Sequence, residues 1–184
     1  RVLNYVSSQG CPYRCGYCSE VSIFGCRWKS LTAERTLNEI LSLSRGYNLN
    51  GIKFYDSNFF VNPSRVIDFS ERLVDSQPGI KWSASAHPKG VIRLSDHFDI
   101  IKKSGLVRLL IGAESGSQRI LDFVKKDITV EQIIASGEIT KKYDLAGWYS
   151  FILGLPSEKP EDVSATIRVM KELKRINPKA YTSI

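Results

Sequence analysis

Three cysteines, Cys11, Cys15 and Cys18, follow one another in C-x-x-x-C-x-x-C spacing, with Pro12 and Gly16 between them. Proline and glycine at these places favour a loop over a packed helix or strand. A structural zinc site needs four closed ligands, whereas iron–sulfur clusters are held by thiolates. A cubane 4Fe–4S cluster also needs four ligands, and the loop offers three. The spacing therefore predicts a cluster with one iron open to a ligand other than protein.

This stretch resembles the signature of the radical S-adenosylmethionine (SAM) superfamily, in which the residue before the last cysteine is usually aromatic, as Tyr17 is here. The resemblance implies that SAM chelates the open iron through its amino and carboxylate groups. It also implies that an electron from the cluster cleaves the sulfonium to give a 5′-deoxyadenosyl radical. The alternative interpretation is a set of cysteines buried in an ordinary core.

The composition places the chain among soluble globular domains. It has 184 residues, of which 42% are hydrophobic and 24% charged, and no apolar run is long enough to span a bilayer. Only Cys26 stands outside the motif, which excludes a disulfide framework and predicts a reducing, cytoplasmic location. The net charge of +7 suits an anionic partner, but the basic residues are dispersed, so nucleic-acid binding is not expected. The chain begins at Arg1, which reads as a segment of a longer protein.

Strand and helix patterns alternate along the chain at intervals of roughly 25 to 35 residues, as βαβ units require. We expect strands over residues 3–6, 52–55, 80–86, 106–111, 148–153 and 180–184. We expect helices over residues 32–46, 62–74, 95–104, 117–124, 129–143 and 160–176. Thr32 and a Thr129–Gln132 capping box begin two of these helices, and Gly46 is expected to supply a left-handed stop. This is an α/β fold, and the family resemblance implies a (β/α)6 partial TIM-like barrel of parallel strands.

Polar segments follow three of these strands, and the carboxyl ends of parallel strands meet at one edge of a sheet. Asp56, Ser57 and Asn58 follow the second strand. They resemble the family's GGE motif, which holds the SAM amino group, and the F-x-D-D-x-F of its cobalamin-associated branch, with Ser57 in place of the second Asp. The alternative is an Asx turn before the next helix.

The segment Gly112-Ala113-Glu114-Ser115-Gly116-Ser117 follows the fourth strand. It resembles the G-x-E-S-G-S of the cobalamin-associated and methylthiotransferase branches, which implies that Glu114 and Ser115 lie near the ribose and methionyl parts of SAM. The alternative is a tight turn in which Ser117 caps the next helix.

Ile152, Gly154 and Leu155 end the fifth strand. They resemble the family's G-x-I-x-G-x-x-E segment, whose backbone lies along the adenine, and Tyr17 is expected to complete that pocket. His87, just before Pro88, faces the predicted mouth as a ligand contact or forms only a turn. The roles of His87 and Cys26 stay open.

Together the segments resemble the cobalamin-associated branch. Residues 1–184 are then expected to be the core domain of a longer enzyme, without the last helix and flanking domains. The cofactors implied are a 4Fe–4S cluster, SAM and, in the full-length parent, cobalamin. The expected reaction is hydrogen abstraction from a small-molecule or peptide substrate for methyl transfer or cyclisation, with an electron donor such as flavodoxin or ferredoxin. A methylthiotransferase acting on tRNA or protein, and a non-catalytic iron–sulfur or metal-binding module, are the alternatives.

Overall fold

Six parallel strands form the main sheet of the computed structural model, which describes residues 1–76 and 78–184. Their spatial order follows the chain, so each strand lies beside its successor within this sheet. The strands are β1 (Val2–Tyr5), β4 (Gly51–Phe54), β5 (Lys81–Ala86), β6 (Leu106–Glu114), β7 (Ala146–Phe151) and β8 (Tyr181–Ser183). All five pairings are parallel, which confirms the predicted α/β fold and places every carboxyl end at one edge.

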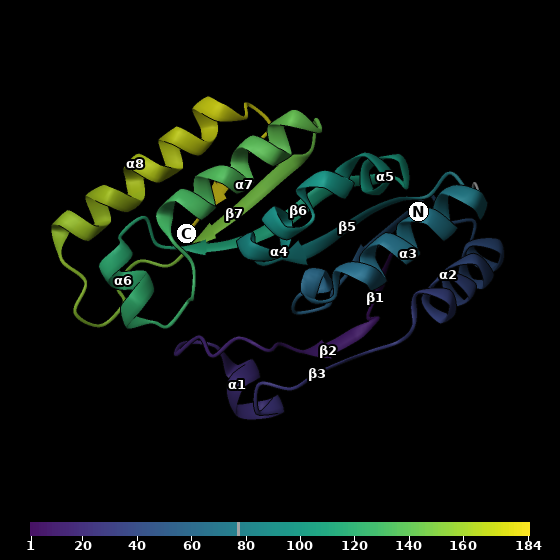
Figure 1. Ribbon diagram of the computed structural model, residues 1–184, viewed down its shortest axis with the longest axis horizontal. Coiled ribbons are helices and arrows are strands. Elements are labelled where there is room, and N and C mark those ends of the chain that lie inside the picture. The colour runs from purple at the N-terminus through teal and green to yellow at the C-terminus, as the bar shows by residue number, and fades with distance from the viewer. Residues whose placement is uncertain (77) are drawn as a thin grey trace.

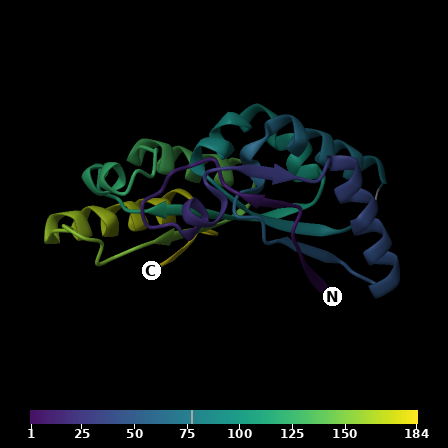
Figure 2. The ribbon, with the colours of Figure 1, turned by 90° about the horizontal axis from the view of Figure 1, so that it is seen from below.

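The crossover helices lie along one side of this sheet (Figure 1). Seen from below, most of them lie above the strands, α2 runs down beside the strands at the right, and both chain ends lie below (Figure 2). They are α2 (Ala33–Tyr47), α3 (Pro63–Ser76), α4 (Pro88–Arg93), α5 (Phe98–Lys103), α6 (Gln118–Phe123), α7 (Val130–Lys142) and α8 (Pro160–Ile176). None of the helices within the described residues has the length and apolar content needed to cross a bilayer.

An aromatic cluster joins the sheet to the helices and fixes the loop after β4. Phe59 of that loop lies 4.5 Å from Phe54, 5.7 Å from Phe69 of α3 and 5.4 Å from Trp82 of β5, between ring centroids. All four side chains are buried in the main core. Burial of a large apolar side chain is worth about 1.5–3 kcal/mol. The polar residues that precede Phe59 are therefore attached to a rigid part of the molecule.

A small antiparallel hairpin, β2 (Ser8–Gly10) with β3 (Trp28–Ser30), encloses α1 (Ser19–Phe24) and closes the base of the cysteine loop. These elements lie apart from the other helices (Figure 1). Gly10 has a φ of 77°, and a Cβ there would lie 2.0 Å from the backbone oxygen of Arg27. The two arms of the hairpin approach so closely that only glycine fits. The sequence did not predict β2, β3 or α1, because strands of three residues and a helix of six are too short to show a period.

Two details of the predicted helices were wrong. Gly46 does not end α2, which continues to Tyr47, and Asn48 adopts the left-handed conformation with a φ of 50°. Asparagine tolerates this conformation, so glycine was not required. The helix expected over residues 95–104 begins with a 3₁₀ turn, Ser95–His97, before α5. The Thr32 cap and the Thr129–Gln132 capping box are confirmed.

Candidate functional site

A cavity of about 310 Å³ lies where the strands end, and all three cysteines of the motif line it. Tyr13 and Tyr17 of the same loop and Lys126 after α6 also line it, and the rest of its lining comes from the carboxyl-terminal parts of β5, β6 and β7 and from the segments after β4 and β5. Cys26 does not line this cavity. The fold thus brings the cysteine loop and several of the predicted strand-end segments to one place.

Backbone hydrogen bonds hold the cysteine loop in its curved form. The amide of Cys18 donates to the oxygen of Cys15 at 3.1 Å, and the amide of Gly16 donates to the oxygen of Val124, after α6, at 2.8 Å. Burial raises the pKa of the thiols of Cys11 and Cys15, and a bound metal ion offsets this by favouring thiolate. The loop is therefore fastened on the side opposite the hairpin as well.

The donor geometry discriminates between kinds of metal site. Within residues 1–76 and 78–184, no three side chains of His, Cys, Asp or Glu converge closely enough to bind a single metal ion. In a cubane cluster each cysteine binds a different iron, so three thiolates around one cavity need not converge. The arrangement fits a 4Fe–4S cluster and does not fit a mononuclear zinc site.

A buried ion pair lines the cavity beside the cysteines. The Nζ of Lys126 lies 2.8 Å from Oε1 of Glu114, and the two side chains are only 8% and 9% exposed. The same Nζ donates to the hydroxyl of Tyr17 at 3.2 Å. Burial, and then the carboxylate of Glu114, raise the pKa of Tyr17 above its usual range. Sequence analysis missed Lys126, which follows another lysine just past α6 and carries no motif of its own.

The backbone at the end of β6 is shaped to accommodate this pair. Glu114 has a φ of 63°, and the register with β7 shifts between Gly112 and Glu114. A Cβ at Gly112 would lie 2.3 Å from Oε1 of Glu114 and 2.8 Å from Nζ of Lys126. Glycine thus leaves room for the ion pair to fold back over the strand end, and a larger residue here would displace the ends of these two side chains.

His87 connects three segments around the cavity. Its Nδ1 accepts from the amide of Lys89 at 3.3 Å, so Nε2 carries the proton and donates to the backbone oxygen of Lys126 at 3.2 Å. Its ring stacks on that of Tyr13, with the ring centroids 3.7 Å apart and an angle of 9° between the ring planes. Burial, and then Lys126, lower the pKa of His87 to about 3, so the ring stays neutral. His87 therefore both begins α4 and lines the cavity.

The residues of the segment after β4 have two different roles. Ser57 and Asn58 line the cavity, and Asn58 also accepts from the amide of Phe60 at 3.1 Å, as the Asx-turn alternative expected. Asp56 does not line it and is 1% exposed. Its carboxylate accepts from the amide of Ser7 at 2.7 Å and from the hydroxyls of Ser7 and Ser8 at 2.7 and 2.6 Å. The structure thus uses Asp56 to hold the start of the cysteine loop.

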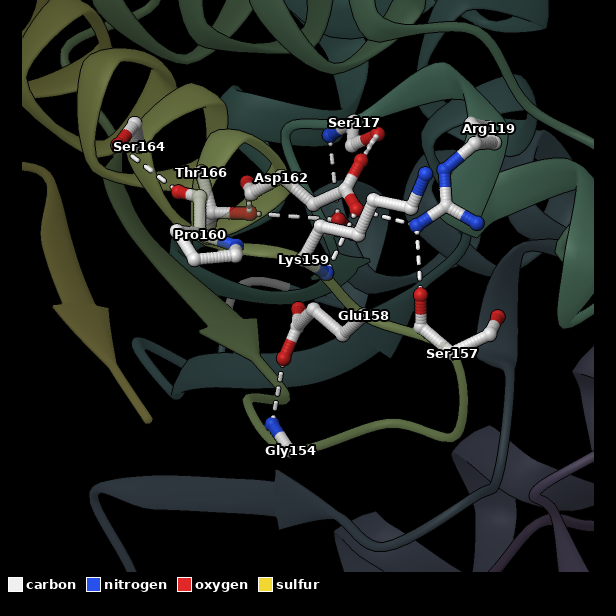
Figure 3. A network of polar contacts seen from close by, with 11 residues as sticks. Ser117, Arg119, Gly154, Ser157, Glu158, Lys159, Pro160, Asp162, Ser164 and Thr166 are labelled. Atoms are coloured by element: carbon white, nitrogen blue, oxygen red, sulfur yellow. Dashed lines mark hydrogen bonds and ion pairs between the residues drawn. The ribbon is translucent and has the colours of Figure 1, made fainter.

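The segment after β6 divides in a similar way, because Glu114 lines the cavity and Ser115 does not. Ser115 is fully buried, and its hydroxyl pairs with that of Thr166 at 3.2 Å. The expectation that the hydroxyl of Ser117 caps α6 was wrong, since it donates to Asp162 at 2.5 Å (Figure 3). A charged acceptor from α8 competes successfully with the backbone amides of a helix of six residues.

Asp162 lies at the centre of a polar network, in which it accepts hydrogen bonds from Ser117 and Arg119 (Figure 3). Hydrogen bonds from Arg119 and then from Ser117 hold its pKa well below the usual range. Arg119 also donates to the backbone oxygen of Ser157, at 2.8 Å. The network fastens the loop after β6 to the first turn of α8 and to the loop after β7.

The segment after β7 lies beside the cavity, and Ile152, Gly154 and Leu155 are not among its lining residues. The amide of Ile152 donates to the oxygen of Glu114 at 2.8 Å, and Leu155 packs in a small cluster with residues of α6. The amide of Gly154 donates to Glu158 at 2.6 Å (Figure 3). Their contact with adenine stays a prediction.

Comparisons with known proteins give a consistent result. The family model described as "Radical SAM superfamily" matches residues 5–170. An uncharacterised methyltransferase of Pyrococcus horikoshii is 37% identical over 169 residues, which make up 91% of this chain and 36% of that protein. An anaerobic magnesium-protoporphyrin IX monomethyl ester cyclase of Rubrivivax gelatinosus is 24% identical over 165 residues, or 90% of this chain and 30% of the cyclase. The chain thus spans about a third of the length of these relatives.

Two solved structures share the fold. OxsB, a cobalamin-dependent SAM radical enzyme solved with aqua-cobalamin and SAM, aligns with a TM-score of 0.81 at 23% identity, over 92% of this chain and 26% of OxsB. TsrM is a radical SAM methyltransferase from Kitasatospora setae that was solved with cobalamin and a 4Fe–4S cluster. It aligns with a TM-score of 0.83 at 17% identity, over 94% of this chain and 35% of TsrM. At these identities the likeness concerns the fold, and it agrees with the partial barrel predicted from the sequence.

A substitution tests whether Asp56 is structural. Replacement of Asp56 by Ala leaves the buried donors of Ser7 and Ser8 without an acceptor. We expect the free energy of unfolding, measured by urea titration of the iron-free protein, to fall by about 2–4 kcal/mol. The matched control is Asp75→Ala, at an exposed position near the end of α3, which should change it by less than about 0.5 kcal/mol. Equal stabilities of the two variants would contradict the structural role.

Proposed function

Because this chain belongs to the radical SAM superfamily, whose members use a 4Fe–4S cluster and SAM, we propose that residues 1–184 are the catalytic core of a longer radical SAM enzyme. One observation carries the proposal: of the cysteines in the described residues, three line a single cavity at the carboxyl edge of a parallel sheet, next to a buried lysine, and Cys26 does not. Such a donor set leaves one iron open to a substrate-derived ligand.

Cys11, Cys15 and Cys18 would hold the cluster. When bound and reduced, it supplies one electron that cleaves the sulfonium of SAM to methionine and a 5′-deoxyadenosyl radical. The residues of this chain bind, orient and shield the reactants, since a carbon radical must be kept from water and from side reactions. His87, stacked on Tyr13 and bonded to the backbone of Lys126, keeps the cluster loop against the sheet.

The remaining cavity residues would orient SAM. The hydroxyl of Ser57 and the side-chain oxygen of Asn58 suit the ammonium group, and Lys126 suits the carboxylate. Glu114 pairs with Lys126 in a buried place and holds it beside Tyr17. In this proposal the backbone of Ile152, Gly154 and Leu155, with the ring of Tyr17, lies along the adenine.

For the whole protein we propose radical chemistry that depends on cobalamin, most simply methyl transfer. The similarity to a methyltransferase and to a ring-forming cyclase supports this, as do the segments after β4, β6 and β7 that resemble the cobalamin-associated branch. The cobalamin would bind outside these 184 residues. The free cysteines support a reducing, cytoplasmic location, and the single electron calls for a donor such as flavodoxin or ferredoxin. A methylthiotransferase, which shares the segment after β6, is the second candidate.

Cysteine substitutions test the cluster. Anaerobic reconstitution should give about four irons per chain in the parent. Cys11→Ala, Cys15→Ala and Cys18→Ala should each lose most of this iron, because an iron loses its protein ligand. Cys26→Ala is the matched control and should retain the iron of the parent, since Cys26 lies outside the cavity. Iron loss in Cys26→Ala with retention in Cys11→Ala would overturn the ligand assignment.

Lys126 is tested with its partner neutralised, because removal of one member of a buried ion pair costs about 3–5 kcal/mol by itself. We expect the double variant Lys126→Met/Glu114→Gln to bind SAM about tenfold more weakly than the parent by equilibrium dialysis, since a charge-assisted hydrogen bond is worth about 1.5–3 kcal/mol. Its iron content should not change. Glu114→Gln alone retains the cation and should bind SAM more tightly than the double variant. Equal affinities of the two variants would argue against the carboxylate contact.

The choice between the two candidate functions rests on the full-length protein. Purified anaerobically with cobalamin supplied, it should show the visible absorption of a bound corrinoid, because methylcobalamin can supply a methyl group to a carbon radical. Absence of cobalamin, together with a second iron–sulfur cluster outside residues 1–184, would favour the methylthiotransferase.

A further inference from the structure

We propose that the face of the sheet opposite the helices binds a small amphipathic substrate through its carboxylate or phosphate group, with Arg108 and Lys53 as the cations that recognise it. This inference rests on the proposed function, since the face continues directly from the cavity that holds the cysteines. It names the chemical class of the substrate that the radical site would receive.

Alternation along the strands defines this face. Trp82, Ala84 and Ala86 of β5 are buried in the core on the helical side, so Ser83 and Ser85 between them point the other way. Ser85 lines the cavity, which shows that the cavity opens onto this face. The same alternation places Arg108, Leu110 and Gly112 of β6 on it.

Strand register arranges the side chains of this face in rows. The first row, at the end of the strands, pairs Gly112 with Ser150. The second row runs Ser85, Leu110, Trp148 and Tyr181, and the third runs Asn4, Lys53, Ser83, Arg108 and Ala146. Successive rows lie roughly 7 Å apart, at about 3.3 Å per residue. The third row, which holds both cations, is thus immediately below the rows that line the cavity.

The two cations are close enough to act on one group. Arg108 and Lys53 flank Ser83 on neighbouring strands, which puts their backbones roughly 10 Å apart. Both side chains are long and flexible, and a guanidinium and an ammonium reach a shared carboxylate or phosphate from two sides. Lys53 donates to the hydroxyl of Tyr55 at 2.9 Å, which adds a third polar group to the same place.

The charge on this face is not balanced. The three rows contain two cations and no carboxylate. Glu114, at the strand end above them, is already paired with Lys126. Within the described residues no salt bridge is formed by Arg108 or Lys53. An anionic ligand is the complement that this arrangement lacks.

The second row supplies an apolar surface between the cations and the cluster. Trp148 is 41% exposed, and its indole nitrogen donates to the hydroxyl of Ser183 at 2.9 Å, which fixes the ring. Leu110 lies beside it in the row and also lines the cavity. An apolar or flat body would rest on these two side chains, with its anionic group below and its reacting carbon toward the cysteines.

The test uses two fluorescent probes and the full-length protein. 1-Pyrenebutyrate carries a flat apolar body and a carboxylate, and 1-pyrenebutanol is its neutral counterpart. Fluorescence anisotropy should show tighter binding of the carboxylate, and Arg108→Gln or Lys53→Gln should weaken it about tenfold, since a lost charge-assisted hydrogen bond is worth about that factor. Binding of pyrenebutanol should not change. Trp148→Ala should weaken both probes.

Arg45→Gln, at an exposed position on α2, is the control for the change in net charge and should bind pyrenebutyrate like the parent. Equal affinities for the two probes, no binding of either probe, or equal effects of Arg108→Gln and Arg45→Gln would overturn the inference. Iron content and the response of the reduced cluster's paramagnetic resonance to SAM are recorded on the same samples. Failure of the probe test with an intact SAM response overturns this inference alone. Loss of the SAM response in the parent counts against the proposed function instead.

Discussion

One lysine determines how the parts of this site are held together. The side chain of Lys126 pairs with Glu114 at the end of β6 and bonds Tyr17 of the cysteine loop, and its backbone oxygen accepts from His87 at the end of β5. Three segments that are distant in sequence therefore meet at a single residue. A buried ammonium is costly unless it is paired, and the pairing coincides with the left-handed conformation of Glu114 and with the space left by the glycine at position 112.

The cysteine loop is fastened in the same manner at its other end. Asp56 accepts three hydrogen bonds from Ser7 and Ser8, and the guanidinium of Arg65 donates to the same Ser7 hydroxyl at 2.6 Å. The loop thus leaves β1 from a buried polar network and meets α6 and β5 at its far side. Such support on both sides holds the three cysteines around one cavity, and a preformed arrangement of ligands lowers the ordering cost of cluster assembly.

The sequence was sufficient for the architecture and for locating the cysteine motif, because both rest on local signals. Hydrophobic period and caps predicted six strands and the crossover helices other than α4, where the sequence analysis considered only a turn or a ligand contact at His87, and cysteine spacing predicted the motif that lines the cavity. The remainder depended on tertiary contacts. Asp56 and Ser115 occupy motif positions, yet their polar atoms are hydrogen-bonded to Ser7 and Ser8, at the start of the cysteine loop, and to Thr166 of α8. Lys126 has no motif, and only the folded chain brings it to Glu114. Which strand residues share a row depends on register, which no single segment encodes.

The central claim is that three cysteines leave one iron for SAM to chelate. Electron–nuclear double resonance on the reduced full-length protein tests it most directly, with SAM labelled by ¹⁵N in the amino group and ¹⁷O in the carboxylate. Direct chelation predicts hyperfine coupling of both labels to the cluster. Saturation with SAM, without coupling from either label, would contradict the account.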